Sequence, residues 1–191
     1  MLIYYSGHGK LRTYQGYEGQ EIKEAYVVPS DSKLNRYSTN ISMKTIIESC
    51  QNCIAKHVLL ILDCCYSGYA TTRGTEPERP RKATERYLDD ITSRRTIQVL
   101  AAGQEDQPVS DNGVRQGYSA FTGALLDILE PELDLDNNAI LTVSEIAANL
   151  EKHTANQKGK VFQRPAYNLI SGSNAGDFVF KIKCTFFDNV H

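Results

Sequence analysis

The amino-acid sequence predicts an α/β fold in which helices flank a mainly parallel central sheet. Short apolar runs that predict strands occur at 2–5, 58–62 and 96–102, and the run at 58–62 is continuous, as is typical of a strand buried on both faces of a parallel sheet. Apolar residues at helical spacing follow from 42, over 120–129 and from 142. Strands that alternate with amphipathic helices are the pattern of an α/β domain.

The composition is that of an ordinary globular domain, with 41% hydrophobic and 23% charged residues. We expect one domain over 1–191, since domains commonly hold about 100–200 residues. The net charge of −2 offers no positive field, and no apolar run approaches the ~18 residues of a membrane span, so we expect neither nucleic acid nor a membrane as partner. Five cysteines, two of them adjacent, do not form the framework of a secreted domain, and a cytoplasmic setting is expected.

The first strand, Leu2–Tyr5, runs directly into Ser6-Gly7-His8-Gly9. A strand that delivers a glycine-flanked polar residue into a loop is a common layout of active sites, although a plain turn with a surface histidine has the same pattern. Lys10–Glu24 is polar and glycine-rich, so it is predicted to be a loop. Ala25–Val28 is predicted to be a second short strand, which Pro29 ends.

A helix is predicted to begin after Ser42, a suitable N-cap. Its apolar positions are Met43, Ile46, Ile47, Cys50 and Ile54. Cys50 and Cys53 are spaced as zinc ligands could be, but no second pair accompanies them, so ordinary burial is the favoured interpretation. Val58–Leu62 then forms a buried strand that leads into Asp63-Cys64-Cys65.

The second half of the chain begins with Tyr69–Arg95, which is rich in Arg, Thr, Pro and Glu. It is predicted to be a long mobile loop with one helical turn near Glu85–Leu88. The elements predicted after it are a strand over Thr96–Ala102, a helix over Ala120–Leu129, a helix that begins at Thr142 with a capping box, and a closing strand over Asp177–Ile182.

His8 and Cys65 both follow apolar strands. If these strands are parallel neighbours, both side chains meet at one edge of the sheet, where α/β folds bind ligands. A thiol is a useful nucleophile only as thiolate, and a nearby imidazole can take its proton and later deliver it to a leaving amine. The pair could therefore carry out acyl transfer, whereas a cysteine at a strand end is by itself more often buried and inert.

The two motifs together resemble those of the caspase-like cysteine peptidases. Tyr4-Tyr5-Ser6-Gly7-His8-Gly9 precedes Leu62-Asp63-Cys64-Cys65-Tyr66-Ser67-Gly68, with the histidine 57 positions before Cys65. The pattern Asp, any residue, Cys, any residue, Ser, Gly is similar to the metacaspase and bacterial caspase-like branch, and aligning on it makes Cys65, not Cys64, the nucleophile.

This resemblance implies a caspase-like fold and a cysteine endopeptidase that acts on protein or peptide substrates. It implies His8 as base, Cys65 as nucleophile, and the backbone N–H groups of Cys65 and Gly9 as donors to the oxyanion. Asp63 and Ser6 match positions that line the primary specificity pocket, which indicates cleavage after Arg or Lys. Asp63 could instead be a carboxylate that caps nearby amides.

The resemblance also raises two expectations about the chain as a whole. Family members carry a strand, helix and strand before the histidine strand, so we expect that the N-terminal part of the domain is missing here. A caspase-fold pseudoenzyme or scaffold that acts through protein–protein interaction is therefore the alternative function. The arginines of 69–95 suggest that an Arg-directed peptidase cuts itself in that loop.

No cofactor is implied as a requirement, but calcium is a candidate. Asp134, Asp136, Asn138 and Glu145 fit the ligand spacing of an EF-hand loop, although Ala139 replaces the glycine of its sharp turn. A polar turn followed by a helix cap explains the same residues without calcium.

Overall fold

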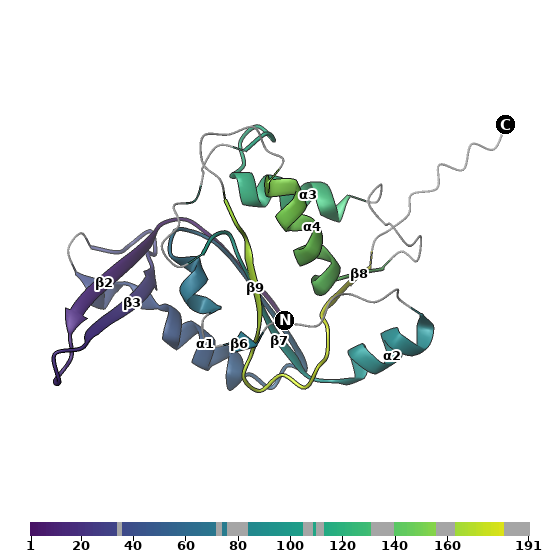
Figure 1. Ribbon diagram of the computed structural model, residues 1–191, viewed down its shortest axis with the longest axis horizontal. Helices are drawn as coiled ribbons and strands as arrows, with labels where there is room; N and C mark the ends of the chain where they lie inside the picture. Colours follow the sequence, from purple (N-terminus) through teal and green to yellow (C-terminus); the bar gives the residue numbers. More distant parts are fainter. Residues whose placement is uncertain are drawn as a thin grey trace.

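The computed structural model describes residues 1–33, 36–71, 74–75, 84–104, 109, 113–130, 140–155 and 163–181. Its central sheet, which has helices on both sides in Figure 1, has the strand order β1-β5-β7-β9-β6. These strands are β1 (Leu2–Ser6), β5 (His57–Asp63), β7 (Thr96–Ala101), β9 (Ala166–Ile170) and β6 (Gly74–Thr75). β1, β5 and β7 are parallel, whereas β9 runs antiparallel to both β7 and β6. The α/β fold with a mainly parallel sheet is confirmed.

Helices cover both faces of this sheet, and β5 supplies the core of both. The helices are α1 (Met43–Gln51), α2 (Glu85–Ser93), α3 (Ala120–Leu129) and α4 (Val143–Ala155). Val58, Leu60 and Leu62 pack with α1, whereas Leu59 and Ile61 pack with α3 and α4. Successive strand residues point to opposite faces, so one continuous apolar run serves two cores. Within the described residues, no helix combines the length and the apolar character needed to cross a membrane.

The helix caps read from the sequence are confirmed. Ser42 Oγ accepts a hydrogen bond from Thr45 N at 3.1 Å at the start of α1. Before α4, Thr142 N donates to Glu145 Oε2 at 2.8 Å and Glu145 N donates to Thr142 Oγ1 at 3.2 Å, which is a capping box. Ile54, predicted to share the apolar stripe of α1, lies beyond the end of that helix and is 99% exposed.

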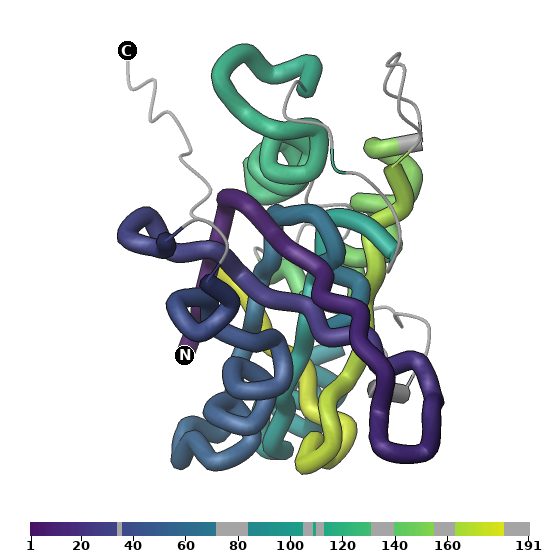
Figure 2. Tube along the Cα trace, turned by 90° about the vertical axis from the view of Figure 1, so that its left-hand side faces the viewer, coloured from purple at the N-terminus to yellow at the C-terminus, as the bar shows by residue number. Residues whose placement is uncertain are grey.

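The predicted loop over Lys10–Glu24 is wrong, because these residues form most of a hairpin. β2 (Gly9–Gln15) and β3 (Glu21–Val27) are antiparallel, and β4 (Ile41–Ser42) completes a second sheet. Figure 2 shows β2 and β3 side by side down to their turn. Gly16 N donates to Gln20 O at 2.8 Å in this turn, and Gly19 has φ +77°. The outer half of the hairpin lies away from the core, so its residues lack the apolar alternation that identifies a strand.

The segment predicted as a long loop with one helical turn contains a full helix, α2, of 9 residues. Thr84 caps it by accepting from Tyr87 N at 3.2 Å. Ile91 is its one fully buried residue, and the helix is short and mostly polar, so it was predicted only as a single turn. Residues 72–73 and 76–83 of the predicted processing loop lie outside the described residues.

The end of the chain differs from the prediction in two ways. The strand expected over Asp177–Ile182 is β10 (Val179–Lys181), which pairs with β8 (Ile140–Thr142) rather than with the central sheet. The central sheet is instead extended by β9, which the sequence analysis missed. β9 is only 5 residues long and its middle positions are half-buried, so it has no continuous apolar run.

A buried polar network joins β7 to the segment before β10. Gln98 Nε2 donates to Asp177 Oδ1 at 2.7 Å and to Tyr167 Oη at 2.6 Å, and Gln98 Oε1 accepts from Phe178 N at 2.8 Å. Asp177 is 4% exposed, and its burial raises the pKa of the carboxyl above its ordinary value. Hydrogen bonds to the carboxylate lower this pKa, but the effect of burial is larger.

This raised pKa predicts a pH-dependent contribution to stability. The folded chain holds the Asp177 proton more tightly than the unfolded chain does, so the contribution is greatest below the unfolded pKa of about 3.9 and is lost as pH rises through the folded value. The Tm of the wild type should therefore fall relative to that of Asp177→Asn as pH rises above about 4, and each kcal/mol of stability that is lost lowers Tm by about 2–4 °C. Thermal unfolding followed by circular dichroism checks this, and a Tm difference that is constant with pH contradicts it.

Candidate active site

The two sequence motifs begin at the same edge of the central sheet. β1 and β5 are parallel neighbours with Ser6 opposite Asp63, as the sequence predicted. Gly7 N donates to Asp63 O at 3.1 Å, which extends the pairing by one residue beyond β1. The chain therefore turns away from both strands at the same level, and the loops with His8 and Cys65 lie side by side.

The two loops make backbone contact through Gly9. A Cβ atom built on Gly9 would lie 3.0 Å from the carbonyl carbon of Cys65, 3.5 Å from its nitrogen, and closer still to its oxygen. Such approaches to backbone atoms leave no room for any side chain at this position. Gly9, the residue after His8, thus packs against Cys65, the predicted nucleophile. His8 is exposed to solvent and Cys65 is half-buried.

Tyr5 and Val28 hold the His8 loop. His8 O accepts from Val28 N at 3.0 Å, and the Tyr5 hydroxyl lies 2.9 Å from His8 O and 3.0 Å from Val28 O. Burial raises the pKa of Tyr5, so its hydroxyl stays protonated and can donate to either carbonyl. The sequence analysis did not assign Tyr5 a role, although it lies inside the histidine motif.

A sharp turn after β5 separates the two adjacent cysteines. Tyr66 has φ 61°, in the left-handed region, and leads into η2 (Ser67–Ala70). Cys64 is 1% exposed in the α1-side core, and burial raises the pKa of its thiol to about 12, with the charges of Asp63 and Cys65 adding to this effect. Cys64 is therefore a protonated core residue near neutral pH, while Cys65 lies at the sheet edge.

Asp63 is the buried carboxylate of the site, at 3% exposure. Its Oδ2 atom accepts from Ser119 Oγ and from Thr122 Oγ1, both at 2.5 Å, and lies 3.5 Å from Ser6 Oγ. Its Oδ1 atom is buried and has no hydrogen-bond partner among the described residues. A buried carboxylate oxygen without a donor is costly, so this atom can gain much from a ligand that supplies one.

Ser119 and Thr122 link this carboxylate to the start of α3. Ser119 is the N-cap of the helix, and its Oγ accepts a hydrogen bond from Thr122 N at 2.9 Å. The same hydroxyl donates its hydrogen to Asp63 Oδ2. The Thr122 hydroxyl has one hydrogen, which it donates to Asp63, so at the 2.7 Å contact the Tyr4 hydroxyl is the donor. Neither residue was predicted, and the only signal in the sequence is a serine immediately before a predicted helix.

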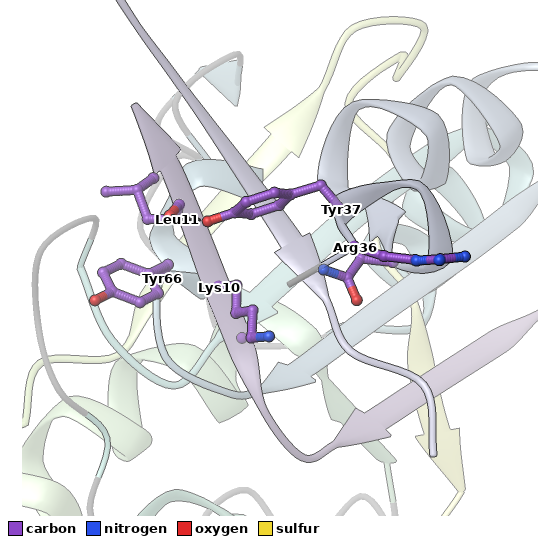
Figure 3. A pocket seen from close by; sticks show the side chains of 7 residues that line it. Lys10, Leu11, Arg36, Tyr37 and Tyr66 are labelled. Carbon is purple, nitrogen blue, oxygen red and sulfur yellow. Dashed lines mark hydrogen bonds between the residues drawn. The ribbon is translucent and has the colours of Figure 1, made fainter. Parts of the chain in front are cut away.

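A polar cavity of about 340 Å³ opens beside the Gly9 contact. Figure 3 shows the residues that line it, which are Gly9, Lys10, Leu11, Arg36, Tyr37, Asn40 and Tyr66. They come from β2, from the chain around η1 (Tyr37–Thr39) and from the turn after Cys65. The cavity thus borders both motif loops.

Metal binding has no candidate site in the part of the chain that the structure describes, where no three His, Cys, Asp or Glu residues are grouped to hold an ion. Most of the calcium-loop candidate, including Asp134, Asp136 and Asn138, lies outside the described residues. Of its remaining positions, Glu145 is engaged in the capping box of α4.

A comparison with models of protein families matches residues 1–171 to the caspase domain. The chain belongs to the caspase family. Caspase-family membership implies a cysteine-type peptidase with protein or peptide substrates, and it confirms the resemblance read from the two motifs. A search of curated proteins found no match to this chain. The roles of the individual residues of this caspase-family site remain predictions, supported by the contacts described above.

The Gly9 contact predicts that Gly9→Ala is harmful to both stability and activity. The added methyl group must displace the Cys65 backbone, and overpacking of this kind typically costs about 1–3 kcal/mol. We expect a lower Tm and a large loss of peptidase activity, measured by thermal unfolding and by cleavage of a fluorogenic peptide.

The matched control is Gly19→Ala, in the hairpin turn. Gly19 has φ +77° but no neighbouring atom within 4 Å, so alanine there adds backbone strain of about 1 kcal/mol without a contact at the site. This control should retain full activity. Equal activity of Gly9→Ala and Gly19→Ala would show that the contact does not position the site.

Proposed function

We propose that the chain is a cysteine endopeptidase that uses Cys65 as nucleophile and His8 as base, and cuts after Arg or Lys. The observation that carries this proposal is the contact between Gly9 and the Cys65 backbone. It brings the residue next to His8 against Cys65, as a reaction shared by an imidazole and a thiol requires.

In the proposed mechanism, His8 takes the proton from Cys65 Sγ, and the thiolate attacks the carbonyl carbon of the substrate. Backbone N–H groups of Cys65 and Gly9 stabilise the oxyanion that forms. His8 then gives its proton to the leaving amine as the C–N bond breaks and a thioester remains. Water, deprotonated by His8, hydrolyses the thioester and restores the thiol.

The choice of Cys65 over Cys64 rests on burial. Cys64 faces the α1-side core with a pKa raised to about 12, so very little thiolate is present near neutral pH. Cys65 is half-buried at the edge of the sheet, next to the Gly9 contact, where a substrate can reach it.

This assignment predicts opposite results for two neighbouring substitutions. Cys65→Ala should lower kcat/KM by at least about 10³-fold, because the nucleophile is lost, and His8→Ala should do the same through loss of the base. Cys64→Ala removes only core volume and should retain most activity. Turnover of a fluorogenic peptide and labelling by an electrophilic peptide measure these effects, and labelling that persists in Cys65→Ala, or wild-type protein that neither turns over nor labels, would favour a different nucleophile or a scaffold role.

The preference for Arg or Lys is supported by the unpartnered oxygen of Asp63. Oδ2 is held by Ser119 and Thr122, which leaves Oδ1 to accept from a substrate cation. The exposed Ser6 hydroxyl lies 3.5 Å from Oδ2, so the carboxylate is one side chain away from solvent at the edge of the sheet. A guanidinium bound there gains charge-assisted hydrogen bonds, whereas an acidic side chain is repelled.

Peptides that end in Arg, Lys, Gln, Leu or Asp before the cut test this preference. Arg, and then Lys, should have the highest kcat/KM, and peptides with Asp should be uncut. Asp63→Asn should lower the Arg-to-Gln ratio by at least tenfold, since a charge-assisted bond is worth about 1.5–3 kcal/mol. Asp90→Asn, an exposed carboxylate on α2, is the control and should leave the ratio unchanged. An unchanged ratio in Asp63→Asn would remove Asp63 from the specificity pocket.

A further inference from the structure

The cavity of about 340 Å³ beside Gly9 has no role in the steps described so far. Two of its lining residues, Gly9 and Tyr66, are the residues that directly follow His8 and Cys65 in the chain. A substrate whose scissile bond lies at Cys65 would therefore have part of its chain at the mouth of this cavity.

The cavity and the hydrogen-bond partners of Asp63 lie on opposite faces of the central sheet. Asp63 faces α3, where its partners Ser119 and Thr122 lie. Leu11 and Tyr66, which line the cavity, pack instead against the core on the α1 side of the sheet. Consider a peptide whose basic side chain lies at Asp63 and whose backbone crosses the edge of the sheet at Cys65. The residues after its scissile bond, which leave on cleavage, then extend toward the cavity.

The cavity is positively charged. Among the described residues, its lining holds Lys10 and Arg36 but no Asp or Glu. In Figure 3, Lys10 lies between Tyr66 and the backbone of Arg36, while the Arg36 guanidinium extends away from Lys10. Lys10 is half-buried and Arg36 is exposed, so Lys10 is the more enclosed of the two cations that line the cavity.

Lys10 has no carboxylate partner in the part of the chain that the structure describes, where the ion pairs involve other cations. The nearest acid in the hairpin register is Glu24, two residues along β3 from Tyr26, the residue opposite Lys10. Its carboxylate accepts from the Tyr26 hydroxyl at 2.5 Å, and Arg12 lies opposite it. No carboxylate of the hairpin thus neutralises the positive charge of Lys10.

We propose that this cavity binds an acidic side chain, Asp or Glu, at the substrate residue directly after the cut, with Lys10 as the principal cation. The proposal rests on the proposed function, because it takes Cys65 as the point of cleavage. A carboxylate gains charge-assisted hydrogen bonds from the ammonium, which has three donors, whereas a basic side chain at this position is repelled. Arg36 adds a weaker, more distant attraction.

The test uses internally quenched peptides with Arg fixed before the cut and Glu, Asp, Gln, Ala or Lys directly after it. For the wild type, kcat/KM for Glu or Asp should exceed that for Lys by about tenfold or more, and that for Gln by several-fold. In Lys10→Gln the Glu-to-Gln ratio should fall to about one. Lys56→Gln, an exposed lysine before β5 at the other end of the sheet, is the control and should leave activity and ratio unchanged.

The outcomes separate this inference from the proposed function. Cleavage after Arg with no acid preference after the cut, or with an acid preference that Lys10→Gln leaves intact, overturns the inference alone. Absence of any cleavage overturns the proposed function. In that case, NMR titration with the peptide amide Glu-Ala-Ala, compared with Gln-Ala-Ala, still tests the cavity: selective shifts of the Gly9 and Tyr66 amides that Lys10→Gln abolishes support it, and their absence overturns it.

Discussion

The backbone contact between Gly9 and Cys65 is the constraint on which the arrangement of the site depends. It joins two segments that are far apart in the chain, and it exists because β1 and β5 are parallel with Ser6 opposite Asp63. A shift of this register by one residue would turn Asp63 to the other face and separate the loops. The apolar residues of both strands, which fix the register through the core, thereby fix where the two motif loops meet.

The alternation of β5 gives three consecutive residues three different surroundings. Asp63 faces α3 and is held by Ser119 and Thr122, Cys64 enters the α1-side core, and Cys65 begins the turn at the edge of the sheet. The left-handed Tyr66 completes this turn. At this strand end, three successive residues are thus a buried carboxylate, a buried core thiol and a half-buried thiol at the edge of the sheet.

The sequence predicted the elements that are buried along their whole length. It did not predict those whose structure depends on contacts with residues far away in the chain. β5, β7 and α3 were predicted because apolar runs and helical spacing mark elements that are buried along their length. The hairpin of β2 and β3 was missed because its outer half has no core to bury, which also hid the cavity at Lys10.

The candidate site shows the same division between local and distant information. His8, Cys65 and Asp63 were predicted as site residues from motifs that are local in the chain. Ser119 and Thr122 could not be found in that way, because their role arises only when α3 packs over the end of β5.

The high pKa of Cys64 has a consequence for oxidation chemistry. Peroxide oxidises a thiolate to a sulfenic acid, and a neighbouring thiolate can then resolve it as a disulfide. Cys64, protonated and buried in the core, is a poor resolving thiol although it adjoins Cys65 in the chain. If Cys65 is oxidised, Cys64 is thus a poor partner for its recovery, and a thiol from solution, such as glutathione, can reduce the sulfenic acid instead.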